Sequence, residues 1–573
     1  MRKDMKINKL VKLFLFISVL AGLFSCNNNS KVEDDFVEEV ITFERIKTVG
    51  REGLYLQPGE TRTIYIDFDS LDSNYLKLEI QTEVNVYGTY NYRNIYNENE
   101  TGTESFYVAK GEDKQEICHF LDAYRPKYNN HTGCSPKRGA HDYYNIPMQT
   151  LMAQGTFRKR LTHMTLKNVS NEAGTVTIYG LYLSNRDLPL EEVYITSGCI
   201  KIGVDLMSGG TLTYLERLNY QTSKGTYHID EILTEENDVY IGVDAENMPG
   251  DIALGSTDHH VNLINYYDVG RQFQQSFYSN IGGTNTATSG QNGYTRKMCW
   301  TGGDAIFWPY NPVQGGDCHV NISQIIDYRR TKNSIYVKCK PLDWADNNCV
   351  TDSYLENWYS IENDVVIVKN SFVDFAGFTD METCDRVQLE LPAAYIVHPF
   401  NRYVTYQGET PWINDETGLI YKANLGSWVK AADIVDKHPE DWFAWVNDDN
   451  FGVGVYIPDV SFYASGRASA STNISYSGNQ NAYSSPMGDS DQLRYNKKEC
   501  DYAYQSCYVG NTCYTAPEIR TTMLDYIPFT YSYAISVDYL QVIRNNFHNI
   551  YLDNVIDNSS MFIWDRTLEG SSD

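Results

Sequence analysis

Apolar and polar residues alternate with a period of two in several stretches of residues 40–190. Ile64, Ile66 and Phe68 follow this pattern, residues 76–80 repeat it, and residues 176–183 form a third stretch of this kind. Side chains along a β-strand point alternately to its two faces, so this period predicts strands with one buried face. Asp, Asn and Gly turns separate the stretches. The pattern predicts a β-sandwich over residues 40–190.

Residues 195–555 continue the β pattern in a larger second unit. Two short apolar stretches, 203–206 and 211–215, flank Gly209 and Gly210 and predict a hairpin, because glycine tolerates positive φ. Helical periodicity is scarce, with no amphipathic helix longer than a few turns. We therefore expect an all-β chain in which this unit is a large antiparallel assembly. A linker is expected at 187–190 and a C-terminal tail at 556–573.

Length and charge narrow the possible functions. The chain has 573 residues, more than one compact core accommodates, so two or three domains are expected. The formal net charge of −27 argues against nucleic acid as a partner and against charge-driven binding to an anionic membrane. It also disfavours a highly sulfated polymer as a substrate, unless a local basic site overrides the overall field.

The first 25 residues have the pattern of a secretory signal peptide. Five basic residues precede or enter an apolar run at 13–24, and Ser25 stands before Cys26. The run is little more than half of the about 20 residues that a membrane-spanning helix needs. Residues 26–39 follow as a polar tether with an acidic cluster at 31–35.

Residues 23–26, Leu-Phe-Ser-Cys, resemble the lipobox of bacterial lipoproteins, in which the cysteine becomes the acylated first residue. The acidic cluster resembles the surface-export signal of Bacteroidota-type lipoproteins, a group whose surface members mostly capture or cut glycans. The resemblance implies lipidation of Cys26, an anchor in the outer membrane with the protein facing outward, and a polysaccharide or oligosaccharide as partner. We expect a monomer.

The hairpin at 203–215 resembles the first hairpin of galactose-mutarotase-like supersandwich domains. Such domains occur in aldose epimerases and in many glycoside hydrolases and polysaccharide lyases. Residues 40–190 resemble the jelly-roll modules that accompany carbohydrate-active enzymes. Together these resemblances imply an N-terminal jelly-roll or β-sandwich followed by a mutarotase-like supersandwich at 195–555.

The densest polar segment is 258–278, which gathers acids, an arginine, amides and aromatic rings. In a strand over 271–278, Arg271, Gln275 and two phenylalanines share one face, whereas Gln272, Gln274, Ser276 and Tyr278 share the other. Either set could form a polar row in a cleft. Alternatively, Asp268 pairs with Arg271 and locks a turn.

A second polar segment, 308–319, contains two prolines and two glycines and is predicted to be a loop. Loops on a rigid sheet often carry binding sites. Trp308 and Tyr310 could stack on a sugar ring, and Asn311, Gln314 and His319 could bond its hydroxyl groups. The alternative is a structural turn rich in polar caps.

Three glutamates, Glu356, Glu390 and Glu440, lie beside aromatic or apolar residues. Burial raises the pKa of such a carboxyl group, which suits a general acid. Two carboxylates across a sugar bond would make a hydrolase. For each one alone, a salt bridge or a solvated strand end is the competing interpretation. Glu390 is the first candidate and Glu356 the second.

The leading hypothesis is a cell-surface glycoside hydrolase. The alternatives are a polysaccharide lyase acting on a uronate-containing glycan, in which His260, His319, Tyr278 and Arg271 carry the chemistry, and a non-catalytic glycan-binding protein. The catalytic candidates are Glu390, Glu356, Asp268 and Asp317. The substrate-binding candidates are His260, Arg271, Gln275, Tyr278, Trp308, Asn311, Gln314 and His319.

No CxxC pair or HExxH motif is present, so we expect no zinc site and no cofactor. Residues 448–450, Asp-Asp-Asn, could hold a structural calcium ion or form a solvated turn. An exported chain permits disulfides, and bridges are predicted for Cys118 with Cys134, for Cys339 with Cys349, and within the group 500, 507 and 513.

Overall fold

The computed structural model is built almost entirely of antiparallel strands in the part of the chain that it describes. That part comprises residues 44–47, 53–68, 75–94, 97–120, 159–184, 192–206, 208–218, 221–222, 225–226, 263–264, 272–277, 310–317, 322–344, 349–377, 381–382, 387–388, 390–397, 402–413, 418–423, 439–446, 449–458, 463–468, 512–519, 522–523, 525–556 and 558. The all-β class expected from the sequence is confirmed.

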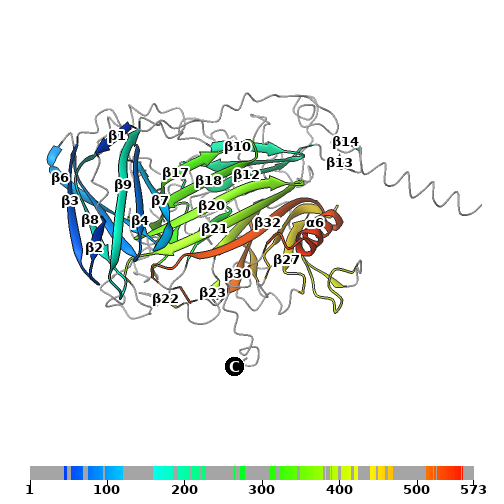
Figure 1. The fold of residues 1–573 in the computed structure, drawn as a ribbon. Coiled ribbons are helices and arrows are strands. Elements are labelled where there is room, and N and C mark those ends of the chain that lie inside the picture. Colours follow the sequence, from blue (N-terminus) through cyan, green and yellow to red (C-terminus); the bar gives the residue numbers. More distant parts are fainter. Residues whose placement is uncertain are drawn as a thin grey trace, which may run out of the picture.

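The N-terminal strands form two facing sheets (Figure 1). The five-stranded sheet has the order β1 (Glu44–Lys47), β9 (Gly174–Ser184), β4 (Tyr75–Thr82) and β7 (Gly111–Phe120), and β2 (Leu54–Leu56) also pairs with β9. The four-stranded sheet has the order β3 (Thr61–Phe68), β8 (Lys159–Asn168), β5 (Val86–Asn94) and β6 (Asn97–Val108). Leu78 and Ile178 of the first sheet and Val86 and Leu166 of the second belong to one buried cluster. The two sheets therefore form a sandwich, and the alternating stretches of the sequence supply its inner faces.

A nine-stranded antiparallel sheet is the centre of the second unit. Its order is β17 (Gln324–Arg330), β18 (Ser334–Lys340), β20 (Ser353–Glu362), β21 (Val365–Asp374), β32 (Phe529–Tyr539), β28 (Phe451–Tyr456), β27 (Trp442–Val446), β25 (Arg402–Tyr406) and β26 (Leu419–Ala423). Along β21 the apolar residues alternate between two different clusters. Val366 and Val368 join one, and Val365 and Ile367 join the other. Both faces of this sheet are thus buried in part.

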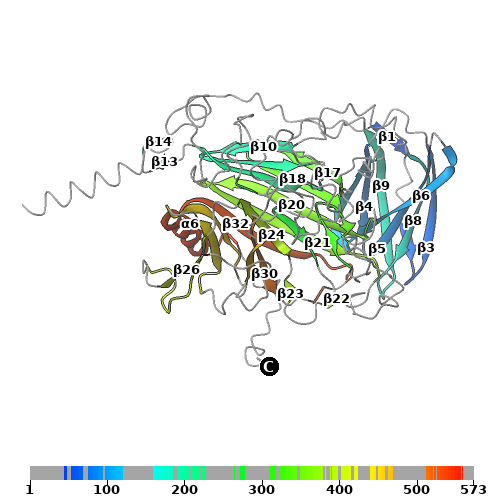
Figure 2. The same ribbon diagram turned by 180° about the vertical axis from the view of Figure 1, so that it is seen from behind.

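One face is covered by two further sheets, the first of which is seen from behind in Figure 2. The seven-stranded sheet has the order β19 (Leu342–Asp343), β16 (Pro312–Val313), β15 (Gln274–Ser276), β24 (Glu390–Val397), β30 (Thr512–Ile519) and β23 (Val387–Gln388), with β29 (Tyr463–Ala468) beside β30. The three-stranded sheet runs β10 (Glu192–Ser197), β11 (Ile200–Asp205) and β12 (Thr211–Arg217). Two small pairs complete the strands: β13 (Gln221–Thr222) with β14 (Gly225–Thr226), and β22 (Met381–Glu382) with β31 (Thr522–Met523).

The opposite face is partly covered by the helix α6 (Leu540–Leu552), which follows β32 directly. Leu540, Ile543, Phe547 and Ile550 lie at helical spacing and are buried against the sheet. The helix has 13 residues, within the few turns that the sequence allowed. No helix among the described residues is long and apolar enough to cross a membrane.

The predicted glycine hairpin is present between β11 and β12. Gly209 and Gly210 have φ values of +60° and +72°, which other residues adopt at a cost. A side chain on Gly209 would also collide with the backbone carbonyl of Gln314, so this turn sits directly against the segment 310–317.

The cysteine predictions need correction. Cys118, Cys339 and Cys349 carry no disulfide, so the bridges predicted from Cys118 and between Cys339 and Cys349 are wrong. Cys118 and Cys339 are buried core residues on strands, where a thiol packs as a small apolar group. Cys199, for which no bridge was predicted, is disulfide-bonded.

Candidate functional site

The strand β15 carries polar side chains on both of its faces. Phe273 and Phe277 belong to the core that faces the nine-stranded sheet, and Gln275 lies between them on the same side. Gln272, Gln274 and Ser276 therefore point to the opposite side, away from that sheet. The two rows expected from the sequence exist, one on each side of β15.

The inner row forms a buried amide network between the two large sheets. The Nε2 group of Gln314 donates to Oδ1 of Asn357 at 2.8 Å and to the carbonyl oxygen of Gly209 at 3.0 Å. The Oε1 atom of Gln314 accepts from the backbone N–H of Gln275 at 3.1 Å. Asn357 then donates to Oδ1 of Asn370 at 2.5 Å. These residues connect β15, the hairpin before β12, and strands β20 and β21.

Most of the hydrogen-bonding capacity of this network is used within the protein. The Nε2 group of Gln275 donates to the backbone carbonyl of Glu356 at 3.0 Å. Gln275, Gln314 and Asn357 are each no more than 1% exposed. Two atoms of the network, Oε1 of Gln275 and Nδ2 of Asn370, have no hydrogen-bond partner. The hydrogen bonds that are made link the two packed sheets. The inner row therefore holds β15 and the segment 310–317 in place.

The outer row lies beside Glu390, the first-ranked carboxylate of the sequence. Ser276 pairs in register with Glu390, and Gln274 pairs with Ala393. Residues directly opposite each other in an antiparallel pair project from the same face. The hydroxyl of Ser276 donates to Oδ1 of Asn311 at 2.8 Å. We call the group Gln272, Gln274, Ser276, Asn311 and Glu390 the outer polar face.

Three amide atoms of the outer polar face lack hydrogen-bond partners. Neither the Nε2 nor the Oε1 atom of Gln272 has one, although the side chain is fully buried, and the Nε2 atom of Gln274 has none either. A buried polar group without a partner costs about 1–3 kcal/mol. Ordered water, an ion or a ligand normally satisfies such groups. Further atoms of this kind occur outside the outer polar face, at Thr211 and Gln275.

Glu390 is also a buried member of this face, with 7% of its surface exposed. The hydroxyl of Tyr395 lies 3.5 Å from Oε1 of Glu390, at the limit of a hydrogen bond. Tyr395 was not a sequence candidate. Its position, five residues after Glu390, does not show that its hydroxyl group lies near that carboxyl group. Amides donate to and accept from hydroxyl groups, and a carboxyl group can transfer protons. The face holds one carboxyl group, and its five side chains are buried, with at most 7% of their surface exposed.

Glu356 lies elsewhere. Its carboxylate accepts a hydrogen bond from the hydroxyl of Tyr336 at 2.7 Å and lies 3.8 Å from the ammonium group of Lys338. Its neighbour Asn357 points into the inner network, so Glu356 points to the other face of the nine-stranded sheet. The structure does not bring Glu356 and Glu390 onto one face.

The remaining sequence candidates divide into two groups. Asp317 is fully buried at the end of the segment that holds Asn311 and Gln314. The candidates outside the described residues are Cys26, His260, Asp268, Arg271, Tyr278, Trp308 and His319.

Among the described residues, no three His, Cys, Asp or Glu side chains are grouped to hold a metal ion. Of the calcium candidates, Asn450 accepts a hydrogen bond from Arg402 at 2.9 Å, and Asp448 lies outside the described residues.

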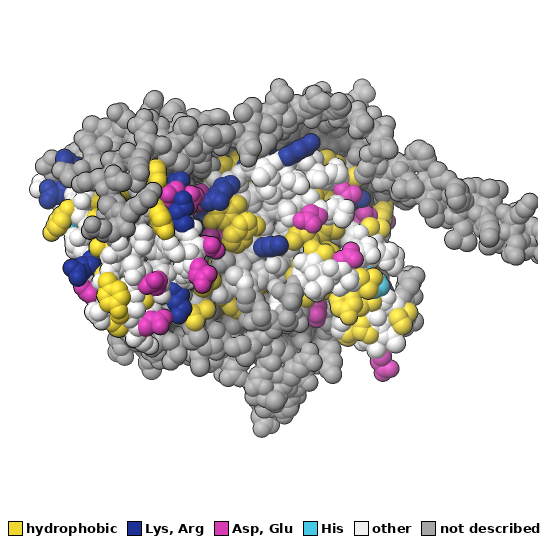
Figure 3. All heavy atoms as spheres, viewed as in Figure 1, with side chains coloured by type: hydrophobic (Ala, Val, Ile, Leu, Met, Phe, Trp, Pro, Cys, Tyr) yellow, Lys and Arg dark blue, Asp and Glu magenta, His cyan; other side chains and the backbone are white. Residues whose placement is uncertain are grey.

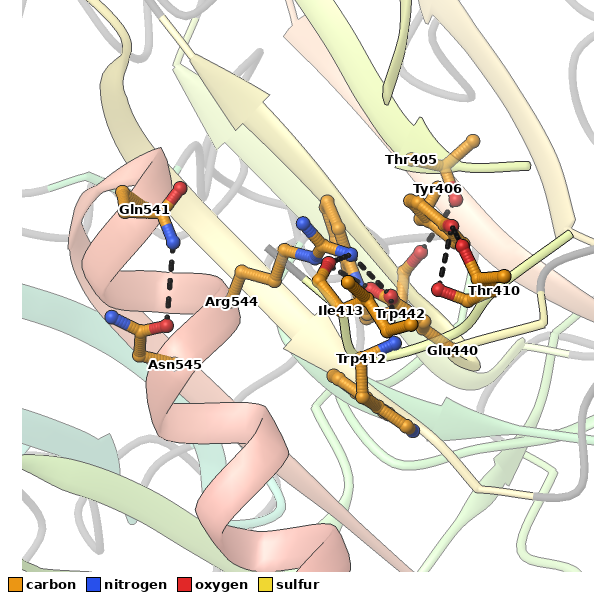
Figure 4. Close-up of polar contacts among 10 residues, drawn as sticks. All are labelled: Thr405, Tyr406, Thr410, Trp412, Ile413, Glu440, Trp442, Gln541, Arg544 and Asn545. Carbon is orange, nitrogen blue, oxygen red and sulfur yellow. Dashed lines mark hydrogen bonds and ion pairs between the residues drawn. The ribbon is translucent and has the colours of Figure 1, made fainter. Parts of the chain in front are cut away.

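Glu440, the third glutamate considered, is part of a buried ion pair (Figure 4). The guanidinium group of Arg544 on α6 donates to both of its carboxylate oxygens, at 2.5 and 2.9 Å. Trp442 Nε1 and the backbone N–H of Trp412 also donate to it, at 2.7 and 2.6 Å. With four donors and 1% exposure, this carboxylate ties α6 to β27.

Asp374 is a buried carboxyl group that the sequence did not single out. The hydroxyl of Tyr310 donates to it at 2.7 Å and the backbone N–H of Ala376 at 3.0 Å. Burial raises the pKa of Asp374 to about 8, although these two donors pull it down, and Asp525 and Asp352 raise it further. Asp374 is flanked by Val373 and Phe375, the same apolar setting that singled out Glu390, so this signal in the sequence was available and was not used.

Comparisons with known proteins add weak likenesses to solved structures. No family model and no curated protein sequence matches the chain. A galactose mutarotase related enzyme from Lactobacillus acidophilus aligns with a TM-score of 0.29 and 12% identity, over 60% of this chain and 97% of that one. A galactose mutarotase-like protein from Lactobacillus casei gives a TM-score of 0.29 and 8% identity, over 60% and 99%. The 4-alpha-glucanotransferase from Thermococcus litoralis gives 0.23 and 12%, over 61% and 37%. At these TM-scores the likenesses carry no argument about function.

Proposed function

We propose that the protein is a glycan-degrading enzyme, a glycoside hydrolase whose site is the outer polar face. The observation that carries the proposal is the position of Glu390 on the same sheet face as the unpartnered amide groups of Gln272 and Gln274. Sugar hydroxyls both donate and accept hydrogen bonds, so a glycan would satisfy these groups. Nucleic acid is a poor alternative for a chain with a net charge of −27.

In this proposal Glu390 is the proton-transferring carboxyl group. Tyr395 lies within reach of its Oε1 atom. Asn311, which accepts a hydrogen bond from Ser276 on the other side of β15, would bind a sugar hydroxyl. Glycoside hydrolysis uses two carboxyl groups flanking the scissile bond. Asp317, in the same segment as Asn311, and Asp268 are the proposed second members.

The proposal includes an extracellular location. The leader at 1–25 and the cysteine that follows it support export and lipid anchoring at Cys26. A surface enzyme of this kind meets polymeric glycans before they enter the cell.

The test is a screen of the purified protein against plant, algal and host polysaccharides. New reducing ends and the ultraviolet absorbance of unsaturated uronates are measured together. We expect reducing ends without the absorbance. Glu390→Gln should lower kcat by about 100-fold or more, the usual contribution of a positioned acid or base. Glu362→Gln, an exposed carboxylate at the end of β20, is the matched control and should retain activity.

Other outcomes would replace the proposal. Reducing ends together with the absorbance would identify a lyase and move the chemistry to His260, Tyr278 and Arg271. Retention of a glycan with neither signal would identify a binding protein. Full activity in Glu390→Gln would remove the outer polar face as the catalytic site.

A further inference from the structure

The outward face of the nine-stranded sheet has two covered ends and an open middle. At one end Ile326, Tyr354 and Val373 are buried in the core of the N-terminal sandwich. At the other end Ile367 and Ala534 are buried beneath α6. Figure 3 shows the face between them, where hydrophobic side chains gather next to Lys and Arg.

A single row of side chains crosses this open strip from strand to strand. Arg329 of β17 is in register with Tyr336 of β18, Tyr336 with Trp358 of β20, and Trp358 with Lys369 of β21. Residues in register lie side by side on one face, with about 4.8 Å between strands. The row therefore has two aromatic rings in the middle and a cation at each end. We call it the cation–aromatic row.

The aromatic centre of the row is open and pre-organised. Trp358 is 40% exposed, and its ring centroid lies 5.0 Å from that of Tyr336 with 35° between the ring planes. The hydroxyl of Tyr336 is held by Glu356, and the guanidinium group of Arg329 lies 5.3 Å from the Tyr336 ring centroid. A large rigid ring held at the surface offers contact area at low entropic cost.

The charges around the row leave an excess of one positive charge. Arg329, at one end of the row, pairs with Asp327 at 3.1 Å, and Lys338 of the neighbouring row lies 3.8 Å from Glu356. Lys369 is exposed and has no carboxylate partner among the described residues. In a chain with a net charge of −27, such a strip is the kind of local basic site that an anionic ligand requires.

We propose that the cation–aromatic row binds an acidic saccharide, with a sugar ring on Trp358 and carboxylate or sulfate groups near Arg329 and Lys369. The row lies on the far side of the nine-stranded sheet from β15 and the outer polar face. It is thus a second glycan-binding surface, and it does not depend on Glu390 being catalytic.

The test measures binding of the purified protein to oligogalacturonate, oligoalginate and chondroitin sulfate fragments, by calorimetry at low and high salt. We expect at least one probe to bind. Trp358→Ala should weaken this binding about tenfold, the scale of one lost aromatic stacking contact, whereas Trp358→Phe retains most of it. Lys369→Gln should weaken it about threefold, and this difference should shrink at high salt.

The controls replace other exposed side chains of the same kinds, Tyr551→Ala on α6 and Lys332→Gln in the turn after β17, and should bind as the unaltered protein does. Circular dichroism confirms that each variant is folded. No binding to any probe, equal binding of the methyl-esterified oligogalacturonate, or unchanged binding in Trp358→Ala would each overturn the proposal. Binding retained in Glu390→Gln would separate this surface from the catalytic site, whereas loss there would overturn their independence.

Discussion

Three buried carboxyl groups of this molecule, two from glutamates and one from an aspartate, have different surroundings. Glu440 receives four hydrogen bonds, two of them from the Arg544 guanidinium group. Asp374 receives only neutral donors, and burial raises its pKa to about 8. Glu390 lies beside amide atoms without partners. A buried charge needs a partner, and the ion pair with Arg544 supplies one for Glu440, whereas the raised pKa of Asp374 favours its protonated form.

The raised pKa of Asp374 predicts a pH dependence of stability. Its native pKa of about 8 lies above the value of about 3.9 in an unfolded chain, so the native state binds more protons between these limits. The free energy of unfolding should therefore fall as pH rises from about 4 to about 8, by at most about 1.4 kcal/mol per pH unit from this group. Asp374→Asn mimics the protonated form and should remove that part of the slope. Urea unfolding at pH 5, 6, 7 and 8 measures the difference between the two proteins.

The exposed Asp113→Asn, on β7, is the control for this series and should leave the slope unchanged. Parallel pH dependences for Asp374→Asn and the unaltered protein would show that Asp374 is ionised in the native state throughout this range.

The sequence singled out Glu390 and Asn311, which lie on the outer polar face, and Gln275 and Gln314, which lie in the inner network. It also divided the segment of β15 into two polar rows. Both rows contain amides, but only the row of Gln275 also contains phenylalanines, so the sequence does carry a signal for which row faces the other sheet. The choice depends on Phe273 and Phe277, which pack against the nine-stranded sheet and turn Gln272 and Gln274 away from it.

At the scale of elements, strands with a period of two were predictable and the helix was harder to place. The stretches at 64–68, 76–80 and 176–183 fall within β3, β4 and β9, because one buried face dictates their pattern. The helix α6 begins immediately after the apolar strand β32, and it has only 13 residues. A hydrophobic pattern with helical spacing is hard to recognise when it is this short and directly follows the apolar residues of a long strand.

The packing of α6 against β28 predicts that a side chain at position 454, now Gly454, would lower the stability of the fold. A Cβ atom there would collide with Ile543 and lie 2.9 Å from the ring of Phe547, both on α6. Gly454→Ala should therefore lower the free energy of unfolding by about 1–3 kcal/mol, as overpacking does. In an Ile543→Ala background the same change should cost less, because the colliding side chain is gone. Urea unfolding of the four proteins in this cycle measures the coupling.

The matched control is Gly111→Ala, where the nearest atom to an added Cβ is 3.8 Å away. An additive cycle, with equal costs in both backgrounds, would mean that α6 does not rest on Gly454.

At the scale of the whole molecule, the sandwich and the nine-stranded sheet share a core. The N–H of Tyr107 on β6 donates to the Tyr354 hydroxyl on β20 at 3.3 Å, and Lys340 donates to the carbonyl oxygen of Ser105 at 2.9 Å. Ser105 also donates to Asp352. These partners are more than 230 residues apart in the sequence, so no local sequence pattern predicts the contacts between them. The sequence predicted two units and a linker, but not how firmly the units are joined.

This shared core predicts that the two parts unfold together, and Phe375 is one of the residues that join them. Its side chain is 1% exposed and its ring lies against those of Tyr107, at 5.9 Å between centroids, and Tyr354, at 4.9 Å. The unaltered protein should show one calorimetric transition, whereas Phe375→Ala should lose about 3–5 kcal/mol and separate the transition into two. Phe451→Ala, in the core that faces the seven-stranded sheet, should lower the transition temperature without dividing it. Two transitions in the unaltered protein would mean that the contacts between the parts do not couple their unfolding.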